Sequence, residues 1–175
     1  ILSEKDVRIA LQHATNKQNI SDGIFYGLEK PADTLFAKTI PYCNIDLEPY
    51  AYDLTLAGQI LDDAGWKMGS GNVREKDGQP LNIDLLYNSD SVTEKSIAEY
   101  LQSEYQSIGV SLNIHGEEEQ SYRDNMKAGN FDMVFNICWG TPYDPQSSLA
   151  AMRAPVYGDY AAQLGLDDKA EIDDA

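Results

Sequence analysis

The sequence of 175 residues is 42% hydrophobic and 24% charged, which is typical of one globular domain or one lobe of a larger protein. Its formal net charge of -16 repels phosphate groups, so it argues against nucleic acid and anionic membrane surfaces as partners. No apolar run is long enough to cross a bilayer. Because the chain starts at Ile1 and not at Met, we expect it to be a piece of a longer protein.

Two helices are predicted at the amino-terminal end of the chain. Ser3 followed by Asp6 is typical of a helix start with an acidic first turn. The apolar residues that then recur at helical spacing are Val7, Ala10, Leu11 and Ala14. A second, shorter helix is predicted over residues 19–25, with its end near Gly27.

Residues 28–52 form a long segment that is interrupted by Pro31, Pro41 and Pro49. The segment is too rich in proline for regular secondary structure. It is also too apolar for a disordered linker. We therefore expect an ordered, proline-rich loop that lies over the domain.

The next region carries the signals of a capped helix and a hairpin. Asp53 is placed to cap a helix, and Gly65 ends it in a position where a left-handed residue is favoured. The apolar residues of this helix are Leu56, Ile60, Leu61 and Ala64. Trp66 is expected to pack back on the helix end, and the pair Asp77 and Gly78 predicts the turn of a small hairpin.

Residues 81–138 are predicted to form a βαβαβ core. The stretch LNIDLLY alternates apolar and polar residues as a strand does, and Ser91 with Glu94 forms a capping-box pattern after it. The first core helix is predicted to bury Ile97, Leu101, Tyr105 and Ile108 and to stop at Gly109. A strand over VSLNI and a short helix around Tyr122 and Met126, ending at Gly129, follow. The last strand, FDMVFNIC, would carry Phe131, Met133, Phe135 and Ile137 on one face. This alternation predicts an α/β fold with a largely parallel sheet flanked by helices.

A loop with two large aromatic residues follows the last predicted strand. Trp139 and Tyr143 lie in the stretch WGTPYDP. In open α/β sheets, ligands bind beyond the carboxyl ends of the strands. Two rings at that place can offer a ligand a flat apolar surface with a polar tip. The alternative is that both rings pack against the last helix of the chain.

The sequence carries no catalytic motif. His13 lies in a helical pattern and His115 at a strand end, and both are interpreted as surface or boundary residues. Cys43 and Cys138 are not spaced from the histidines as zinc ligands are, so a structural zinc site is not expected. Cys138 lies in an apolar predicted strand and is interpreted as a buried thiol. The acidic run at residues 117–119 is interpreted as a solvated helix start, with a site for a hard metal as the alternative. We therefore expect no catalytic residue and no cofactor.

Six stretches, taken in chain order, carry a family resemblance: DVRIALQHATNK, PADTLF with IPY, YDLTLAGQILDDAGW, REKDGQPLNIDLLY, IAEYLQSEYQSIGVSLNI and FDMVFNICWGTPYDP. Together they resemble the second lobe of extracytoplasmic solute-binding proteins of ABC importers, in the peptide- and nickel-binding family 5. The resemblance covers nearly the whole chain. It implies that residues 1–175 are an incomplete second, carboxyl-terminal lobe with the type II periplasmic-binding-protein fold.

Finer motifs resemble the nickel-binding subgroup, namely PADTLF, REKDGQPL, GEEE and WGTPYDP with MR. Peptide-binding members commonly carry an aspartate just before the tyrosine of the aromatic loop, where it pairs with the amino terminus of the peptide. This chain has Pro142 there, which argues against a peptide because its ammonium group would be left unpaired. One departure is Tyr157, which stands where nickel-binding relatives have a histidine that contacts the metal. A phenol is a poor nickel ligand at neutral pH, so either the metal arrives wrapped in a small chelator or the ligand is something else.

The resemblance implies that the chain captures a nickel–chelate as a transported ligand and not as a cofactor. The implied ligand-binding residues are Trp139, Gly140, Thr141, Tyr143 and Tyr157, with no direct metal ligand among them. The implied partners are the permease subunits of an ABC transporter and the missing first lobe of the same protein. The implied location is extracytoplasmic, in the periplasm or at the cell surface on a lipid anchor. The alternatives are an oligopeptide- or dipeptide-binding protein, an α/β enzyme domain, and a chaperone or sensor lobe that docks on a membrane partner.

Overall fold

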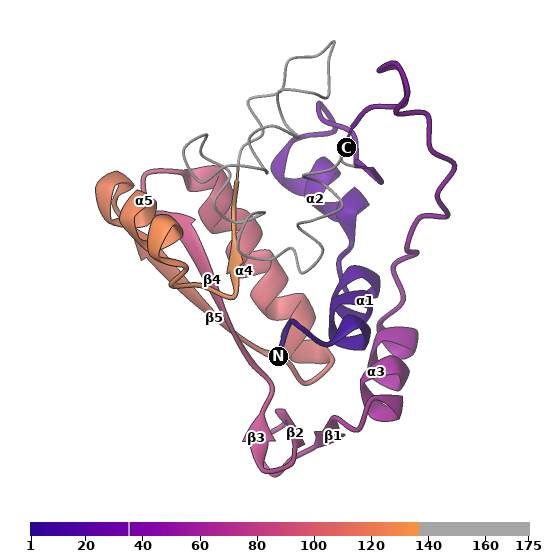
Figure 1. Cartoon of the computed structure of the whole chain (residues 1–175), viewed down its shortest axis with the longest axis vertical. Coiled ribbons are helices and arrows are strands. Elements are labelled where there is room, and N and C mark those ends of the chain that lie inside the picture. The colour runs from indigo at the N-terminus through magenta and orange to yellow at the C-terminus, as the bar shows by residue number, and fades with distance from the viewer. Residues whose placement is uncertain (35, 137–175) are drawn as a thin grey trace, which may run out of the picture.

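The computed structural model of the chain describes residues 1–34 and 36–136, and all elements below belong to this part (Figure 1). The first half contains α1 (Lys5–His13), α2 (Lys17–Ile24), α3 (Leu54–Asp63), β1 (Lys67–Met68), β2 (Arg74–Lys76) and β3 (Gln79–Pro80). The second half contains β4 (Asn82–Asn88), α4 (Val92–Ser107), β5 (Ser111–Glu117), α5 (Glu119–Ala128) and β6 (Met133–Val134). None of the helices within these ranges is long and apolar enough to cross a membrane.

The main sheet has the strand order β5-β4-β6, and the central strand β4 pairs in parallel with both neighbours. Leu85 on β4 lies opposite Ile114 on β5 and opposite Met133 on β6. Each parallel return passes through a helix, α4 or α5, as crossover connections require. The predicted α/β fold, with a parallel sheet flanked by helices, is therefore confirmed.

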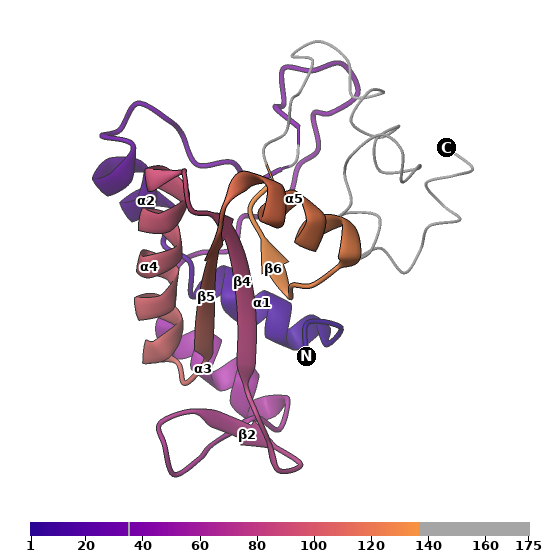
Figure 2. The same ribbon diagram turned by 90° about the vertical axis from the view of Figure 1, so that its left-hand side faces the viewer.

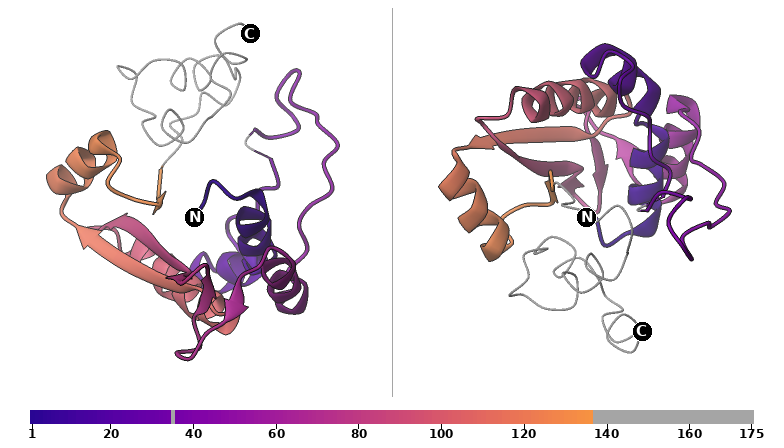
Figure 3. Two further views of the ribbon diagram at one scale, coloured as in Figure 1. Left: turned by 60° about the horizontal axis from the view of Figure 1, so that its bottom comes forward. Right: turned by 90° about the horizontal axis from the view of Figure 1, so that it is seen from above.

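The two faces of the sheet are covered by different helices. Ile83 and Leu85 are buried on one face, in a cluster that includes residues of α1, α3 and α4. Leu86 is buried on the other face, together with Tyr122 and Met126 of α5. Figures 2 and 3 accordingly show α4 and α5 on opposite sides of β4 and β5. Each fully buried aliphatic side chain contributes about 2 kcal/mol to this packing.

The third strand of the sheet differs from its prediction. Within the described residues β6 covers only Met133–Val134, and the predicted positions Ile137 and Cys138 lie outside them. Met133 and Phe135 pack against the main core, but Phe131 packs with the cluster on the α5 face. The prediction that Phe131 shares a face with Met133 and Phe135 is therefore wrong. The strand alternation begins only at Met133, so it does not extend back to Phe131.

The first helix also begins differently from its prediction. The residue at the N-cap of α1 is Glu4 and not Ser3, although Asp6 lies in the first turn as expected. The Glu4 carboxylate makes no cap bond, because it accepts hydrogen bonds from Lys76 at 2.8 Å and from the Trp66 indole at 3.3 Å. It thereby ties the start of α1 to the hairpin region.

Three predicted helix ends are confirmed. The helix α2 runs over Lys17–Ile24, slightly earlier than predicted, because the Asn16 side chain caps it by accepting from the Asn19 amide at 3.0 Å. Gly27 then follows with a φ of 71°. Gly109 and Gly129 follow α4 and α5 in the same left-handed region, with φ angles of 82° and 73°.

The region from α3 to β3 folds as its local signals predict. Asp53 caps α3, since its carboxylate accepts from the Leu56 amide at 2.9 Å. Trp66 is 3% exposed, and its amide donates to the Leu61 carbonyl at 2.9 Å, so it packs back on the helix end. Asp77 and Gly78 connect β2 and β3 with φ angles of 51° and 78°, which is the turn that this residue pair favours.

The proline-rich segment 28–52 contains no helix or strand among its described residues. It leaves the end of α2, swings outward beside α1 and returns to the start of α3 (Figure 1), where Asp53 donates its amide to the His13 carbonyl at 2.9 Å. Cys43 is buried within it, but many of its apolar side chains are exposed. The exposed set is Leu28, Tyr42, Ile45, Leu47, Tyr50 and Tyr52. That this segment is an ordered cover of the domain stays a prediction.

Candidate functional site at the carboxyl edge of the sheet

The carboxyl ends of the three parallel strands meet at one edge of the sheet. There β4 ends at Asn88, β5 ends at Glu117, and the chain leaves β6 through Phe135. Both core helices begin at the same edge, α4 after β4 and α5 after β5. Ligands of open α/β sheets bind at this edge, so it is the candidate functional site.

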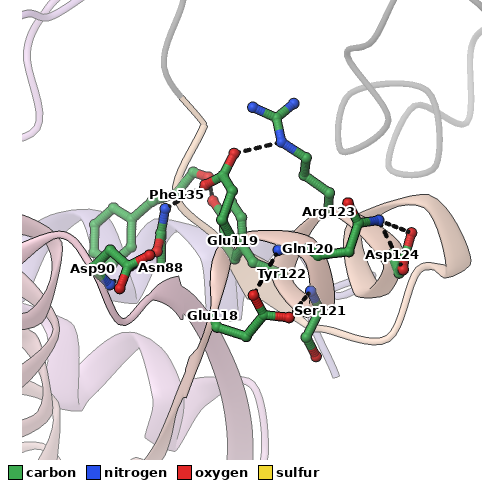
Figure 4. A network of polar contacts seen from close by, with 10 residues as sticks. All are labelled: Asn88, Asp90, Glu118, Glu119, Gln120, Ser121, Tyr122, Arg123, Asp124 and Phe135. Carbon is green, nitrogen blue, oxygen red and sulfur yellow. Dashed lines mark hydrogen bonds and ion pairs between the residues drawn. The ribbon is translucent and has the colours of Figure 1, made fainter.

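Asn88 connects β4 to the first turns of both helices. Its side-chain amide donates to Glu119 Oε2 on α5 at 2.6 Å, and its backbone amide donates to Glu94 Oε2 on α4 at 2.8 Å. Its side-chain oxygen accepts from the Asp90 amide at 3.0 Å (Figure 4).

The predicted capping box of Ser91 and Glu94 is only half formed. Ser91 accepts from the Glu94 amide at 3.2 Å, but Glu94 returns its bond to Asn88 instead of Ser91.

Within the acidic run 117–119, Glu117 ends β5, and Glu118 and Glu119 form the start of α5, as the helix-start interpretation predicts. Glu118 is the N-cap residue, and its carboxylate accepts from the amides of Gln120 at 3.3 Å and Ser121 at 3.1 Å. Ser121 donates its hydroxyl to Glu117 Oε2 at 2.8 Å. Glu119 pairs with Arg123 one turn further along α5 (Figure 4). Within residues 1–34 and 36–136, no group of three or more His, Cys, Asp or Glu side chains could hold a metal ion.

Tyr122 joins α5 to the exit of β6. Its ring is 8% exposed, and its hydroxyl donates to the Phe135 carbonyl (Figure 4). Burial, together with the nearby carboxylates of Glu94 and Glu119, raises the pKa of Tyr122 to about 12. The hydroxyl therefore keeps its proton, and remains a donor, throughout the neutral range.

The ligand-binding residues predicted from the sequence follow this edge along the chain. Trp139, Gly140, Thr141, Tyr143 and Tyr157 all lie outside the described residues. The described chain reaches Asn136, three residues before Trp139. The described part of β6 ends at the carboxyl edge, and the place of the aromatic loop relative to this edge stays a prediction.

A second polar group lies on the α5 face of the sheet and was missed by the sequence analysis. His115 Nε2 lies 3.0 Å from Asp84 Oδ1, which also accepts from the Asn113 side chain at 3.1 Å. The hydrogen bond from His115, and then that from Asn113, hold the pKa of Asp84 below its ordinary value. This pair borders a hollow of about 260 Å³ that is also lined by Leu86, Glu117, Asn130 and Phe131.

This pair could have been found from the strand alternation. Asp84 lies opposite Asn113 in the parallel register, so His115 is the next residue of β5 on the same face. Both side chains are about half exposed, at 55% for Asp84 and 53% for His115. The exposure fits the prediction that His115 is a surface residue, and such an exposed ion pair contributes little to stability.

Comparison with known proteins identifies the family. Residues 1–159 match the family described as bacterial extracellular solute-binding proteins, family 5 Middle. The chain belongs to this family. Among curated family 5 proteins, it is 43% identical over 172 residues to the nickel-binding periplasmic protein of Escherichia coli K12, which covers 98% of this chain. It is 27% identical over 165 residues to the oligopeptide-binding protein OppA of Lactococcus lactis subsp. cremoris, which covers 88% of it.

Solved family 5 structures agree with these relatives. The structure of NikA from Brucella suis in complex with Fe(III)-EDTA is 47% identical, with a TM-score of 0.89 over 98% of this chain. The structure of NikZ from Campylobacter jejuni in complex with Ni(L-His) is 26% identical, with a TM-score of 0.77 over 91%.

The chain corresponds to only part of these proteins. It spans 33% of the E. coli relative and 27% of the Lactococcus relative. It spans 35% of the NikA chain and 32% of the NikZ chain. About two-thirds of the length of the relatives therefore has no counterpart in the 175 residues.

Proposed function

We propose that this chain is part of the substrate-binding component of an ABC importer, and that this component captures nickel as a complex with a small chelator. The observation that carries the proposal is the identity of 43% to a nickel-binding periplasmic protein over nearly the whole chain. The NikA and NikZ relatives support a chelate as the ligand, since their structures hold Fe(III)-EDTA and Ni(L-His).

The proposed site is the loop that follows the carboxyl edge of the sheet. The rings of Trp139 and Tyr143 would stack on the chelate, and their polar N–H and O–H groups could form hydrogen bonds with it. Gly140 would offer backbone groups, and Thr141 would offer backbone groups and a hydroxyl. Tyr157 would contact the chelate and not the metal, because a neutral phenol is a poor nickel ligand. In this proposal the nickel–chelate is cargo and not a cofactor, and the protein is a binder and not an enzyme.

The proposed binding mechanism needs more than this chain. We propose that residues 1–175 are an incomplete second lobe, and that the ligand is enclosed when this lobe closes on the first lobe by a hinge motion. The partners would be that first lobe and the permease subunits of the transporter. The location would be extracytoplasmic, in the periplasm or on a lipid anchor at the cell surface.

A second candidate is an oligopeptide receptor, which the relative OppA supports. Pro142 argues against it, because peptide-binding members commonly carry at this position an aspartate that pairs with the ammonium group of the peptide. The identity to OppA is 27%, against 43% to the nickel-binding relative, so the nickel–chelate is preferred.

Native mass spectrometry of the full-length two-lobed protein tests the proposal. The protein is purified without added ligand from its own source, and then again after addition of nickel(II) with L-histidine. We expect an added mass with the nickel isotope pattern, and we expect Trp139→Ala to lose it. Met68→Ala is the control, because Met68 lies in the hairpin at the amino end of β4, away from the carboxyl edge.

The outcomes separate the candidates. A ladder of added masses that match short peptides would overturn the nickel proposal in favour of the peptide receptor. A protein without added mass in either preparation would favour a lobe that docks on a partner without cargo. Retention of nickel in the Trp139→Ala variant, as in the Met68→Ala control, would place the ligand away from the aromatic loop.

A further inference from the structure

The backbone at the exit of β6 is held from the side by α5. Phe135 donates its amide to the Leu86 carbonyl at 3.4 Å, at the long end of the hydrogen-bond range. The Phe135 carbonyl accepts from the Tyr122 hydroxyl (Figure 4). Tyr122 thus holds the backbone of Phe135 from the side, next to the last contact with β4 within the described residues.

Tyr122 can act as a fixed anchor because two sets of contacts hold it in place, those of its own ring and those of the helix α5 that carries it. Its ring is buried against Leu86 and Met126 on the α5 face of the sheet. The first turn of α5 is tied to the ends of the two neighbouring strands, through Glu119 to Asn88 on β4 and through Ser121 to Glu117 on β5. The contacts with the carboxyl ends of β4 and β5 therefore fix the position of the Tyr122 hydroxyl. The hydroxyl in turn fixes the position of the Phe135 carbonyl, which follows β6.

The anchored carbonyl lies close to the aromatic loop along the chain. Trp139 follows Phe135 by four residues, which span at most about 14 Å even when fully extended. The position of the Phe135 carbonyl therefore limits where Trp139 can lie. A buried tyrosine donor suits this task because it stays protonated at neutral pH, in agreement with its raised pKa of about 12.

We propose that Tyr122 is a positioning residue for ligand capture, whose hydroxyl fixes the backbone from which the loop with Trp139 and Tyr143 starts. This inference rests on the proposed function, since that loop is the proposed ligand site. It assigns α5 a role in binding although α5 itself need not touch the ligand.

The test compares Tyr122→Phe with Tyr105→Phe in the full-length protein. Both substitutions remove one buried tyrosine hydroxyl and keep the ring. Tyr105 is 3% exposed, and its hydroxyl lies 3.0 Å from the Thr15 hydroxyl, which links α4 to the chain after α1 at the opposite end of the core. Tyr105→Phe thus reports the general effect of losing such a bond, and thermal unfolding shows that both variants remain folded.

Two readouts decide the role of Tyr122. Hydrogen–deuterium exchange without ligand should become at least about fivefold faster at the amides of residues 136–145 in Tyr122→Phe, as expected for the loss of one hydrogen bond, and stay unchanged in Tyr105→Phe. The Kd for nickel(II) with L-histidine should rise about fivefold in Tyr122→Phe alone.

The proposal is overturned if exchange in residues 136–145 is unchanged by Tyr122→Phe, or if both variants weaken nickel binding equally. It is also overturned if exchange rises but the Kd of a bound chelate does not. The exchange experiment needs no ligand, so it still decides whether Tyr122 holds this backbone if the wild-type protein fails to bind the nickel probe. That failure would refute the proposed function separately.

Discussion

Arg74 places a charged group inside the protein and uses it to connect three elements. The residue is 6% exposed. Its guanidinium donates to the Ile108 carbonyl at 2.7 Å, to the Trp66 carbonyl at 2.6 Å and to Asp62 Oδ1 at 2.8 Å. These acceptors lie at the ends of α4 and α3, so Arg74 joins the hairpin to both helix ends. A buried charge with such full pairing is costly to disrupt.

We expect Arg74→Met to lower the free energy of unfolding by about 3 kcal/mol, because two buried carbonyls and one carboxylate lose their donor. Urea denaturation followed by circular dichroism measures the change. The matched control is Lys67→Ala, which also removes a cation beside Asp62 but an exposed one, so it should cost less than about 0.5 kcal/mol. Equal losses of unfolding free energy in the two variants would contradict the claim that the buried hydrogen bonds of Arg74 stabilise the fold.

The pairing of Asp62 with Arg74 also predicts how stability depends on pH. The hydrogen bond from Arg74 holds the pKa of Asp62 below its ordinary value of 3.8. A lowered pKa in the folded state stabilises the protein above the unfolded value, and this stabilisation is lost as the pH falls through the folded value. We therefore expect Asp62→Asn to be less stable than the wild type at pH 7 but to lose less stability below about pH 4.

Urea unfolding midpoints of the wild type and of Asp62→Asn, measured from pH 7 to below about pH 4, check this expectation. Asp63→Asn is the control, because Asp63 is the exposed neighbour of Asp62 and should retain the wild-type profile. If the midpoints of the wild type and of Asp62→Asn fall equally as the pH is lowered, the ion pair does not contribute to acid sensitivity.

At the scale of elements, α3 depends on one capping side chain. The Asp53 carboxylate accepts from the Leu56 amide, one of the amides at a helix start that lack a partner within the helix. We expect Asp53→Ala to cost about 1 kcal/mol of unfolding free energy, measured by urea denaturation. Asp63→Ala at the other end of the same helix should be neutral or slightly stabilising, since a carboxylate there opposes the helix dipole. A loss of stability in both variants would contradict the cap interpretation.

The elements that could be predicted from the sequence are those with local signals. Asp53, Gly65 and the Asp77–Gly78 turn each act within a few residues, so their neighbours in sequence are also their neighbours in space. The helices and the parallel sheet followed from apolar spacing and from the alternation of strands and helices. Local hydrogen bonding and periodicity were sufficient for this part of the fold.

The features that the sequence could not predict depend on partners far along the chain. The Glu4 carboxylate bonds to Lys76, 72 residues away, and this bond competes with capping of α1. Asn88 reaches Glu119 across 31 residues, and Tyr122 bonds to the backbone of Phe135, which carries no side-chain signal. Of the candidate site, the sequence could therefore predict the edge of the sheet but not the network of hydrogen bonds at this edge, and the role of the aromatic loop stays a prediction.

At the scale of the whole molecule, the chain supplies one side of the proposed binding site. It spans about a third of its nickel-binding relative, and the proposed mechanism needs a second lobe to enclose the ligand. Closure adds contacts from the other side and removes water from the ligand. The affinity of one side alone should be much smaller, because every 1.4 kcal/mol of lost contact energy weakens binding tenfold.

We therefore expect the isolated 175-residue chain to bind nickel(II) with L-histidine at least about 100-fold more weakly than the full-length protein, which corresponds to the loss of about 3 kcal/mol. Isothermal titration calorimetry on both proteins measures the two Kd values. Circular dichroism of the isolated chain, compared before and after thermal unfolding, shows whether it is folded under the conditions of the titration. Nanomolar binding by the folded, isolated chain would contradict the two-lobed mechanism, because it would mean that this lobe alone supplies the contacts that hold the chelate.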